Sequence, residues 1–155
     1  MGTEIERKFL IASDDWRAEA TDSVEMTQGY IAETGSCSIR VRIAGDRAWL
    51  NLKEIRLGAR RGEFEYEVPA EEGRDMLRLF CDGDLIEKTR HRVRHGDHLW
   101  EIDEFAGLNL GLIVAEVELG SEDESVDLPA WVGEEVTDDS RYYNIKLVES
   151  PYSGW

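Results

Sequence analysis

Most of the 155-residue chain alternates between apolar and charged side chains, one residue after the other. Successive side chains of an extended strand point to opposite faces, so this period of two indicates β-strands with one apolar and one polar face. Gly45-Asp46 and Gly96-Asp97 are turn sequences that join two pairs of these strands as hairpins. The predicted strands cover residues 3–11, 26–32, 38–43, 47–54, 62–68, 85–95, 99–105 and 112–119.

Short helices are predicted between the strands. Residues 71–81 carry an apolar stripe at helical spacing, with Gly83 as a stop signal, and residues 123–132 form a second, short helix. Asp138 or Asp139 caps a last helix over residues 141–149, and a weaker helical turn covers residues 14–20. Eight mostly antiparallel strands with a few helices predict a mainly β (α+β) protein, folded as a closed eight-stranded barrel with flanking helices.

The polar face of these strands carries dense charge of both signs, and the charges are sorted by strand. Acids fall on residues 62–68, 99–105 and 112–119, whereas bases fall on residues 38–43, 47–54 and 85–95. On any one strand, a solvated sheet face is the simpler explanation. Across all strands together, the sorting and the scarcity of Ser, Thr, Asn and Gln favour a barrel whose charged face points inward.

Such an interior suits a multiply anionic ligand. Arginine and lysine bind phosphate oxygens, and the predicted basic group is Lys8, Arg40, Arg42, Lys53, Lys88 and Arg90. Carboxylates can face phosphate only through a hard divalent cation, so the acidic group indicates Mg²⁺ or Mn²⁺. The predicted acidic group is Glu4, Glu6, Glu63, Glu65, Asp103, Glu116 and Glu118.

The overall composition limits the partners. A net charge of −16 argues against nucleic acid on the outer surface. The chain has no apolar run of the ~18 residues that a membrane helix needs. Cys37 and Cys81 form no CxxC pair, which is typical of a reduced, cytoplasmic protein. The outer apolar face of the barrel is compatible with a homodimer.

In order along the whole chain, these motifs resemble the CYTH, or triphosphate tunnel metalloenzyme, superfamily. Its hallmark is Glu-x-Glu-x-Lys at the N-terminus, here Glu4-Ile5-Glu6-Arg7-Lys8. The further matching segments are Gln28-Gly29-Tyr30, Arg40-Val41-Arg42, Leu52-Lys53, Glu63-Phe64-Glu65, Lys88-Thr89-Arg90, Ile102-Asp103, Glu116-Val117-Glu118 and Tyr142-Tyr143-Asn144. The resemblance implies one such domain over residues 1–155, an antiparallel tunnel barrel and a requirement for a divalent metal.

The family hosts inorganic, thiamine and RNA triphosphatases and class IV adenylate cyclases, and the short chain resembles its compact bacterial inorganic triphosphatases. We therefore expect metal-dependent hydrolysis of inorganic triphosphate, a small-molecule substrate. The alternatives are an adenylate cyclase, a thiamine or nucleoside triphosphatase, and a non-enzymatic module that binds polyphosphate or a nucleotide.

The expected roles follow the sorting of charge. Glu4, Glu6 and Glu118 hold one metal ion, and the basic group binds phosphate, with Lys8 also in the catalytic set. Glu63, Glu65, Asp103 and Glu116 hold a second metal or orient the attacking water. Tyr30 either contacts the ligand or packs at the barrel mouth.

Overall fold

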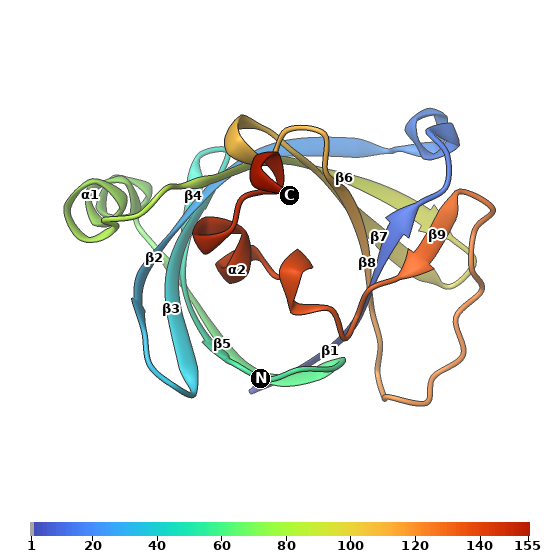
Figure 1. Ribbon diagram of the computed structural model, residues 1–155, viewed down its shortest axis with the longest axis horizontal. Coiled ribbons are helices and arrows are strands. Elements are labelled where there is room, and N and C mark those ends of the chain that lie inside the picture. The colour runs from blue at the N-terminus through green and yellow to red at the C-terminus, as the bar shows by residue number, and fades with distance from the viewer. Residues whose placement is uncertain (1) are drawn as a thin grey trace.

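The alternating pattern forms nine strands in one sheet in the computed structural model, which describes residues 2–155 (Figure 1). The sheet order is β5-β4-β3-β2-β6-β7-β8-β1-β9, and a further pairing of β5 with β1 closes the first eight strands into a barrel. All pairings are antiparallel. The strands are β1 (Thr3–Ile11), β2 (Asp22–Glu33), β3 (Cys37–Ala44), β4 (Arg47–Glu54), β5 (Arg60–Val68), β6 (Ile86–His95), β7 (His98–Phe105), β8 (Ile113–Glu118) and β9 (Val132–Glu135). The predicted eight-stranded antiparallel barrel is confirmed, and β9 was not predicted.

Strand β1 closes the barrel because it pairs on both of its edges. Near its start, Glu4 lies opposite Arg61 of β5, and further along Glu6 lies opposite Glu118 of β8. The short strand β9 adds to the end of β1 from outside the ring, where Phe9 lies opposite Glu135. The hallmark segment at the N-terminus is therefore the seam of the barrel.

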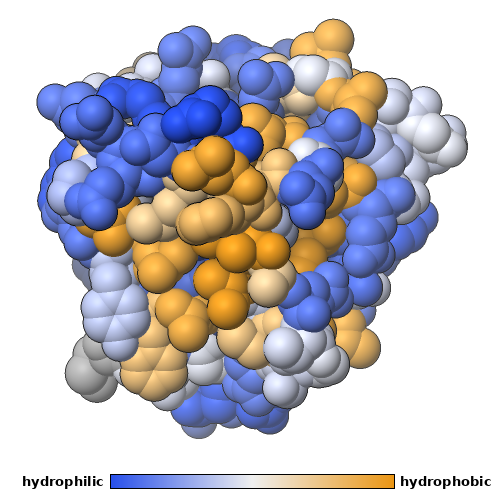
Figure 2. Space-filling model, turned by 90° about the vertical axis from the view of Figure 1, so that its left-hand side faces the viewer, coloured by the Kyte–Doolittle hydropathy of each residue, from blue (hydrophilic) through white to orange (hydrophobic). Residues whose placement is uncertain are grey.

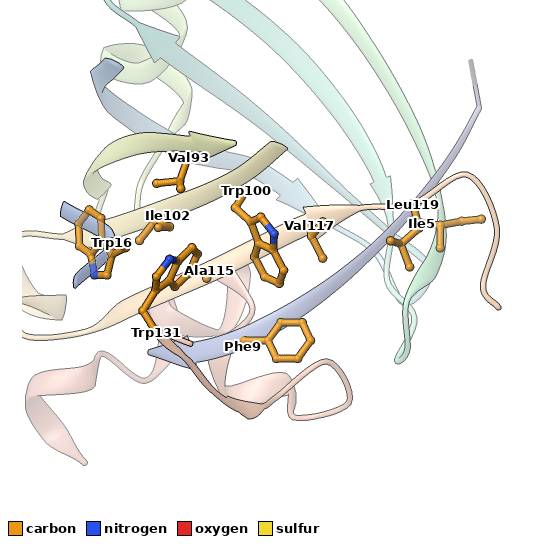
Figure 3. Close-up of a cluster of buried hydrophobic side chains, with 10 residues drawn as sticks. All are labelled: Ile5, Phe9, Trp16, Val93, Trp100, Ile102, Ala115, Val117, Leu119 and Trp131. Atoms are coloured by element: carbon orange, nitrogen blue, oxygen red, sulfur yellow. The ribbon is translucent and has the colours of Figure 1, made fainter. Parts of the chain in front are cut away.

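The apolar faces of β1 and β6–β8 point outward and build the main hydrophobic core there (Figure 3). Trp100 is fully buried in this cluster, with its ring centroid 5.5 Å from that of Phe9 and 5.6 Å from that of Trp131. Trp16, from the 3₁₀ turn Asp15–Glu19 that confirms the predicted helical turn, covers another part of the cluster. The core therefore lies between the barrel wall and the segments outside it, and charged side chains can occupy the barrel interior.

At one end, the inner face of the barrel becomes apolar. Ile86 and Phe105 lie two residues beyond Lys88 and Asp103 on their strands, and both belong to a second buried cluster. Leu147 of helix α2 (Asn144–Glu149) packs into this cluster and is fully buried. Figure 1 shows the C-terminal segment, with the 3₁₀ turn Ser140–Tyr142 and α2, drawn across the opening of the ring. The C-terminal segment thus covers this end of the barrel.

The longer helix, α1 (Ala70–Phe80), packs outside the barrel against β2, β3 and β4. Gly73 makes this approach possible, because a Cβ there would come within 2.5 Å of the Cβ of Ala48. Two residues of the predicted apolar stripe, Leu79 and Phe80, are exposed and not buried against the barrel. Figure 2 shows an apolar area on this side of the molecule. Within residues 2–155, no helix has the length and apolar character needed to cross a bilayer.

The predictions for the remaining helices had mixed outcomes. The helix expected over residues 123–132 is wrong, because this segment is irregular and Val132 already begins β9. Pro129 disfavours a helix around it, and the buried ring of Trp131 ties the segment to the core. The last predicted helix divides into the 3₁₀ turn and α2, and the side chain of Asp139 caps the turn by accepting from the backbone N–H of Arg141. Two further 3₁₀ turns cover Gly107–Asn109 and Tyr152–Gly154.

We predict that Trp100→Ala lowers the free energy of unfolding by about 3 to 5 kcal/mol, because it empties the centre of the outer core. Urea unfolding measures the loss. Trp155→Ala is the matched control, since Trp155 is 45% exposed and its removal should cost much less. Equal losses in the two variants would contradict this placement of the core.

Candidate active site

A cavity of about 580 Å³ lies inside the barrel. Inward-facing side chains from all eight barrel strands line it, together with Asn144 of α2. Its wall carries seven carboxylates: Glu4, Glu6, Glu63, Glu65, Glu101, Glu116 and Glu118. It also carries eight basic side chains: Lys8, Arg40, Arg42, Arg47, Lys53, Lys88, Arg90 and Arg92. The charged face predicted to point inward does so.

Asp103 holds two of the basic side chains from behind the cavity wall. Its carboxylate is fully buried and accepts from Lys88 Nζ at 2.8 Å and from Arg90 Nε and Nη2 at 2.7 and 2.9 Å. Burial opposes its charge, but Arg90 and Lys88 outweigh burial and lower the pKa of Asp103 to about 2. Asp103 does not line the cavity, so its contacts are those of a group that fixes Lys88 and Arg90.

Lys8 and Glu116 form the second buried pair, across the pairing of β1 with β8. Lys8 Nζ lies 2.7 Å from Glu116 Oε1 and 3.4 Å from Glu6 Oε1. Burial works against the charge of Lys8, yet the two carboxylates raise its pKa. Lys8 therefore stays protonated although only 4% of it is exposed.

The carboxylates near the seam repel one another. Burial, followed by the charge of Glu116, raises the pKa of Glu6 to about 7. Burial, followed by Glu4 and Glu6, also raises the pKa of Glu118, which lies opposite Glu6 on the neighbouring strand. Lys53, whose Nζ is 2.9 Å from Glu4 Oε2, balances this cluster only in part. Surplus negative charge of this kind is relieved by a bound cation.

The donor set fits a hard divalent cation. All of the donors are carboxylate oxygens, which Mg²⁺ and Mn²⁺ prefer. Within residues 2–155, no three acidic, His or Cys side chains already converge into a complete metal site. A cation here would therefore need oxygens from its ligand or from water as well, which is the usual way in which proteins hold Mg²⁺ on phosphate.

On the facing wall, the arginines have few partners. Within the described residues, Arg40 and Arg42 each have a buried Nε without a hydrogen bond, and Arg40 Nη2 is 4.0 Å from the nearest oxygen of Glu63. Burial and then the charges of Arg40 and Arg90 lower the pKa of Arg42. Crowded, incompletely paired guanidinium groups are stabilised by an anion placed among them.

On β5, two carboxylates are held by an amide. Asn51 Nδ2 donates to Glu63 at 3.2 Å and to Glu65 at 2.8 Å. Arg42 Nη2 also lies 3.3 Å from Glu65. Both carboxylates line the cavity, and only strand β1 separates β5 from β8 in the closed barrel.

All but two of the predicted site residues line the cavity. Asp103 lies behind the wall, and Tyr30 lines a neighbouring cavity instead. Two residues near strand ends share the inward parity, Arg92 and Glu67, and parity with this position favours surface salt bridges for both. Arg92 pairs with Asp22 and lies 3.7 Å from Glu101, but it also lines the cavity. Glu67 forms a surface salt bridge with Arg47.

The predicted site did not include Glu101 and Asn144, which also line the cavity. Glu101 lies two residues before Asp103, so strand parity alone could have found it. Asn144 accepts from Lys88 at 3.0 Å and from Gln28 at 3.3 Å. The family resemblance includes Asn144, but its place in the cavity wall depends on how α2 packs against the barrel.

Comparisons with known proteins agree with this geometry. The CYTH domain family model matches residues 2–149. An inorganic triphosphatase of Acetivibrio thermocellus is 41% identical over 155 residues, which cover 100% of this chain and 99% of the relative. An inorganic triphosphatase of Nitrosomonas europaea is 39% identical over 153 residues, which cover 96% and 98%.

Solved structures show the same fold. A crystal structure of an inorganic triphosphatase aligns with a TM-score of 0.68 at 37% identity, over 95% of this chain and 98% of the other. A protein of Pyrococcus horikoshii aligns with a TM-score of 0.61 at 19% identity, over 77% and 80%, and this likeness concerns the fold alone.

The raised pKa of Glu6 predicts a pH-dependent stability. Because the folded pKa of about 7 lies above the usual 4.5, the folded chain binds more protons than the unfolded chain between these values. The metal-free protein should therefore lose on the order of 2 to 3 kcal/mol as the pH rises through this window. Urea unfolding in EDTA at about pH 5 and about pH 8 measures the loss.

Glu6→Gln should remove most of this loss, whereas Glu25→Gln, on the same barrel but outside the cavity lining, should keep it. An equally steep pH dependence in Glu6→Gln and the wild type would show that Glu6 does not titrate in this window.

Proposed function

The chain belongs to the CYTH domain family, and from this premise we propose that it hydrolyses inorganic triphosphate to pyrophosphate and phosphate with the help of Mg²⁺ or Mn²⁺. One observation carries the proposal: carboxylates and incompletely paired arginines face one another across the cavity inside the barrel. The full-length relatives named inorganic triphosphatase support it.

The basic side chains bind the substrate. Arg40 and Arg42 offer guanidinium groups whose Nε atoms have no hydrogen-bond partner among the described residues. Lys53 adds a third positive charge, with its Nζ 2.9 Å from Glu4 Oε2. Lys8 on β1 and Lys88 and Arg90 on β6 add positive charge, and Asp103 and Glu116 hold them in place. Triphosphate, a linear anion with several charges, would offset the burial and the repulsion from Arg40 and Arg90 that lower the pKa of Arg42.

Glu4, Glu6 and Glu118 would hold the metal ion. A divalent cation held there would stabilise the charge that develops on phosphoryl oxygens during transfer. The side chains of Glu6 and Glu118 supply the surplus of negative charge that favours it. Glu116, Glu63 and Glu65 are the other cavity carboxylates able to hold a second ion or orient water, whereas Asp103 acts as a positioning residue for Lys88 and Arg90.

The reaction is a displacement at the terminal phosphorus. A water oxygen forms a bond to this phosphorus as the bond to the bridging oxygen breaks, and the electron pair leaves with pyrophosphate. The water gives up its protons to the surroundings, and no covalent intermediate with the protein is needed. The basic wall contributes by stabilising the charge on the leaving group and on the transferred phosphoryl group.

The cavity wall favours an inorganic substrate over a nucleotide. Apolar side chains contribute little to it: Val24, Met26, Ala44 and Trp49. Trp49 is the one aromatic residue of the lining in the part of the chain that the structure describes. Its ring already has the guanidinium carbons of Arg42 and Arg47 at 5.3 and 5.1 Å from its centroid. A nucleobase would therefore compete with existing cation–π contacts for this ring.

Phosphate release from tripolyphosphate, ATP and thiamine triphosphate, measured with Mg²⁺, with Mn²⁺ and with EDTA, tests the proposal. We expect fast release from tripolyphosphate, little from the two organic substrates and none in EDTA. Glu118→Gln should lower kcat roughly a hundredfold or more, because it removes a metal ligand.

Glu67→Gln is the matched control for Glu118→Gln, since Glu67 has the same strand parity as Glu63 and Glu65 but pairs with Arg47 at the surface. Its kcat should equal that of the wild type. Formation of cyclic AMP from ATP, or no release from any substrate, would contradict the proposed function.

A further inference from the structure

A second cavity, of about 290 Å³, adjoins the first one. The two share Lys8, Arg40, Lys53 and Asn144, so these residues form the partition between them. The second cavity opens among the end of β4, the segment before β5, and the C-terminal turn and helix α2. It therefore reaches the same basic residues as the first cavity, but from another side.

The charge balance of the second cavity differs from that of the first. Six basic side chains line it: Lys8, Arg40, Lys53, Arg56, Arg61 and Lys146. Among residues 2–155, Glu54 is the one carboxylate of this lining, and it already accepts from the backbone N–H of Gly62 at 2.9 Å. Lys8, Lys53 and Lys146 have carboxylate partners outside this lining, but within residues 2–155 Arg56 and Arg61 have none. In a chain with a net charge of −16, this local excess of positive charge favours an anion.

Arg61 is the strongest sign that the second cavity is a site. Its side chain is only 6% exposed, and within residues 2–155 it has no carboxylate within salt-bridge distance. Nη2 donates to the backbone oxygen of Gly58 at 3.1 Å, while the buried Nε has no partner. The guanidinium lies over the ring of Tyr143, 4.5 Å from its centroid, which fixes its orientation. A buried cation without a counter-charge is costly, and a bound anion would offset that cost.

We propose that the second cavity is a metal-independent site for a phosphoryl oxyanion, anchored by Arg61 and assisted by Arg56 and Lys146. The lack of spare carboxylates distinguishes it from the first cavity, because nothing there calls for a cation beside the phosphate. The ligand is either free inorganic phosphate or the far end of a polyphosphate chain that extends past the partition. The site goes beyond the proposed hydrolysis and does not require it.

Calorimetric titration of the full chain with inorganic phosphate in EDTA tests this site. We expect the wild type to bind phosphate without metal and Arg61→Gln to bind at least about tenfold more weakly, the loss expected for a charged hydrogen-bond donor. Arg60→Gln is the matched control: it removes the same charge from the neighbouring residue, which pairs with Glu122 outside the cavity. Equal binding by Arg61→Gln and Arg60→Gln, or no binding by the wild type, would overturn the proposal.

Arg56→Gln keeps the test valid should Arg61→Gln fail to fold. Arg56 is exposed, so its replacement should leave the melting temperature unchanged and weaken phosphate binding about threefold. Unchanged binding in this variant, with Arg61→Gln unfolded, would count against the site.

Turnover with chains of two lengths separates the two sources of phosphate. If the ligand is the end of a longer chain, Arg61→Gln should raise KM for tetrapolyphosphate and leave KM for tripolyphosphate unchanged. If the ligand is free phosphate, both KM values stay the same while metal-free phosphate binding is lost. Phosphate binding in EDTA by a protein that hydrolyses nothing would support this site and contradict the proposed function, so the two can fail separately.

Discussion

Ion pairing across the barrel interior is the constraint on which the rest of the structure depends. Closing a sheet with its charged face inward would cost several kcal/mol for each isolated charge. Asp103 neutralises the buried charges of Lys88 and Arg90 by ion pairing, and Glu116 does the same for Lys8. The pairs are buried and short, so they fix the inward side chains in place and leave the remaining charges, above all Glu6 and Arg42, to a ligand and its cation.

Because charged side chains fill the interior, hydrophobic stabilisation has to come from outside the barrel and from its covered end. The tryptophan-rich cluster on the outer face of β1 and β6–β8 supplies much of it, and β9 and the segment before it cover this face. At the covered end of the barrel, Ile86, Phe105 and Leu147 replace the inward charges by an apolar layer. The C-terminal segment thereby carries Asn144 to the cavity and Tyr143 to Arg61, which makes it part of the site as well as a cover.

Strand periodicity predicted most of this arrangement. It located all eight barrel strands and, through parity, the inward face with its basic and acidic groups. It could not place Arg61 as a second anion anchor, because that role depends on which carboxylates lie nearby in space and not on parity. It also missed β9 and assigned a helix over residues 123–132, where Pro129 and the buried Trp131 decide the local structure. The cytoplasmic location, the absence of a nucleic-acid partner and the homodimer stay predictions.

The most direct measurement of the central claim is a crystal structure of the chain with tripolyphosphate and Mn²⁺, with the metal located by its anomalous scattering. The account predicts that the triphosphate lies in the larger cavity against Arg40, Arg42 and Lys53, with Mn²⁺ between its oxygens and the carboxylates of Glu4, Glu6 and Glu118. Triphosphate bound outside the barrel, or Mn²⁺ bound away from these carboxylates, would contradict it.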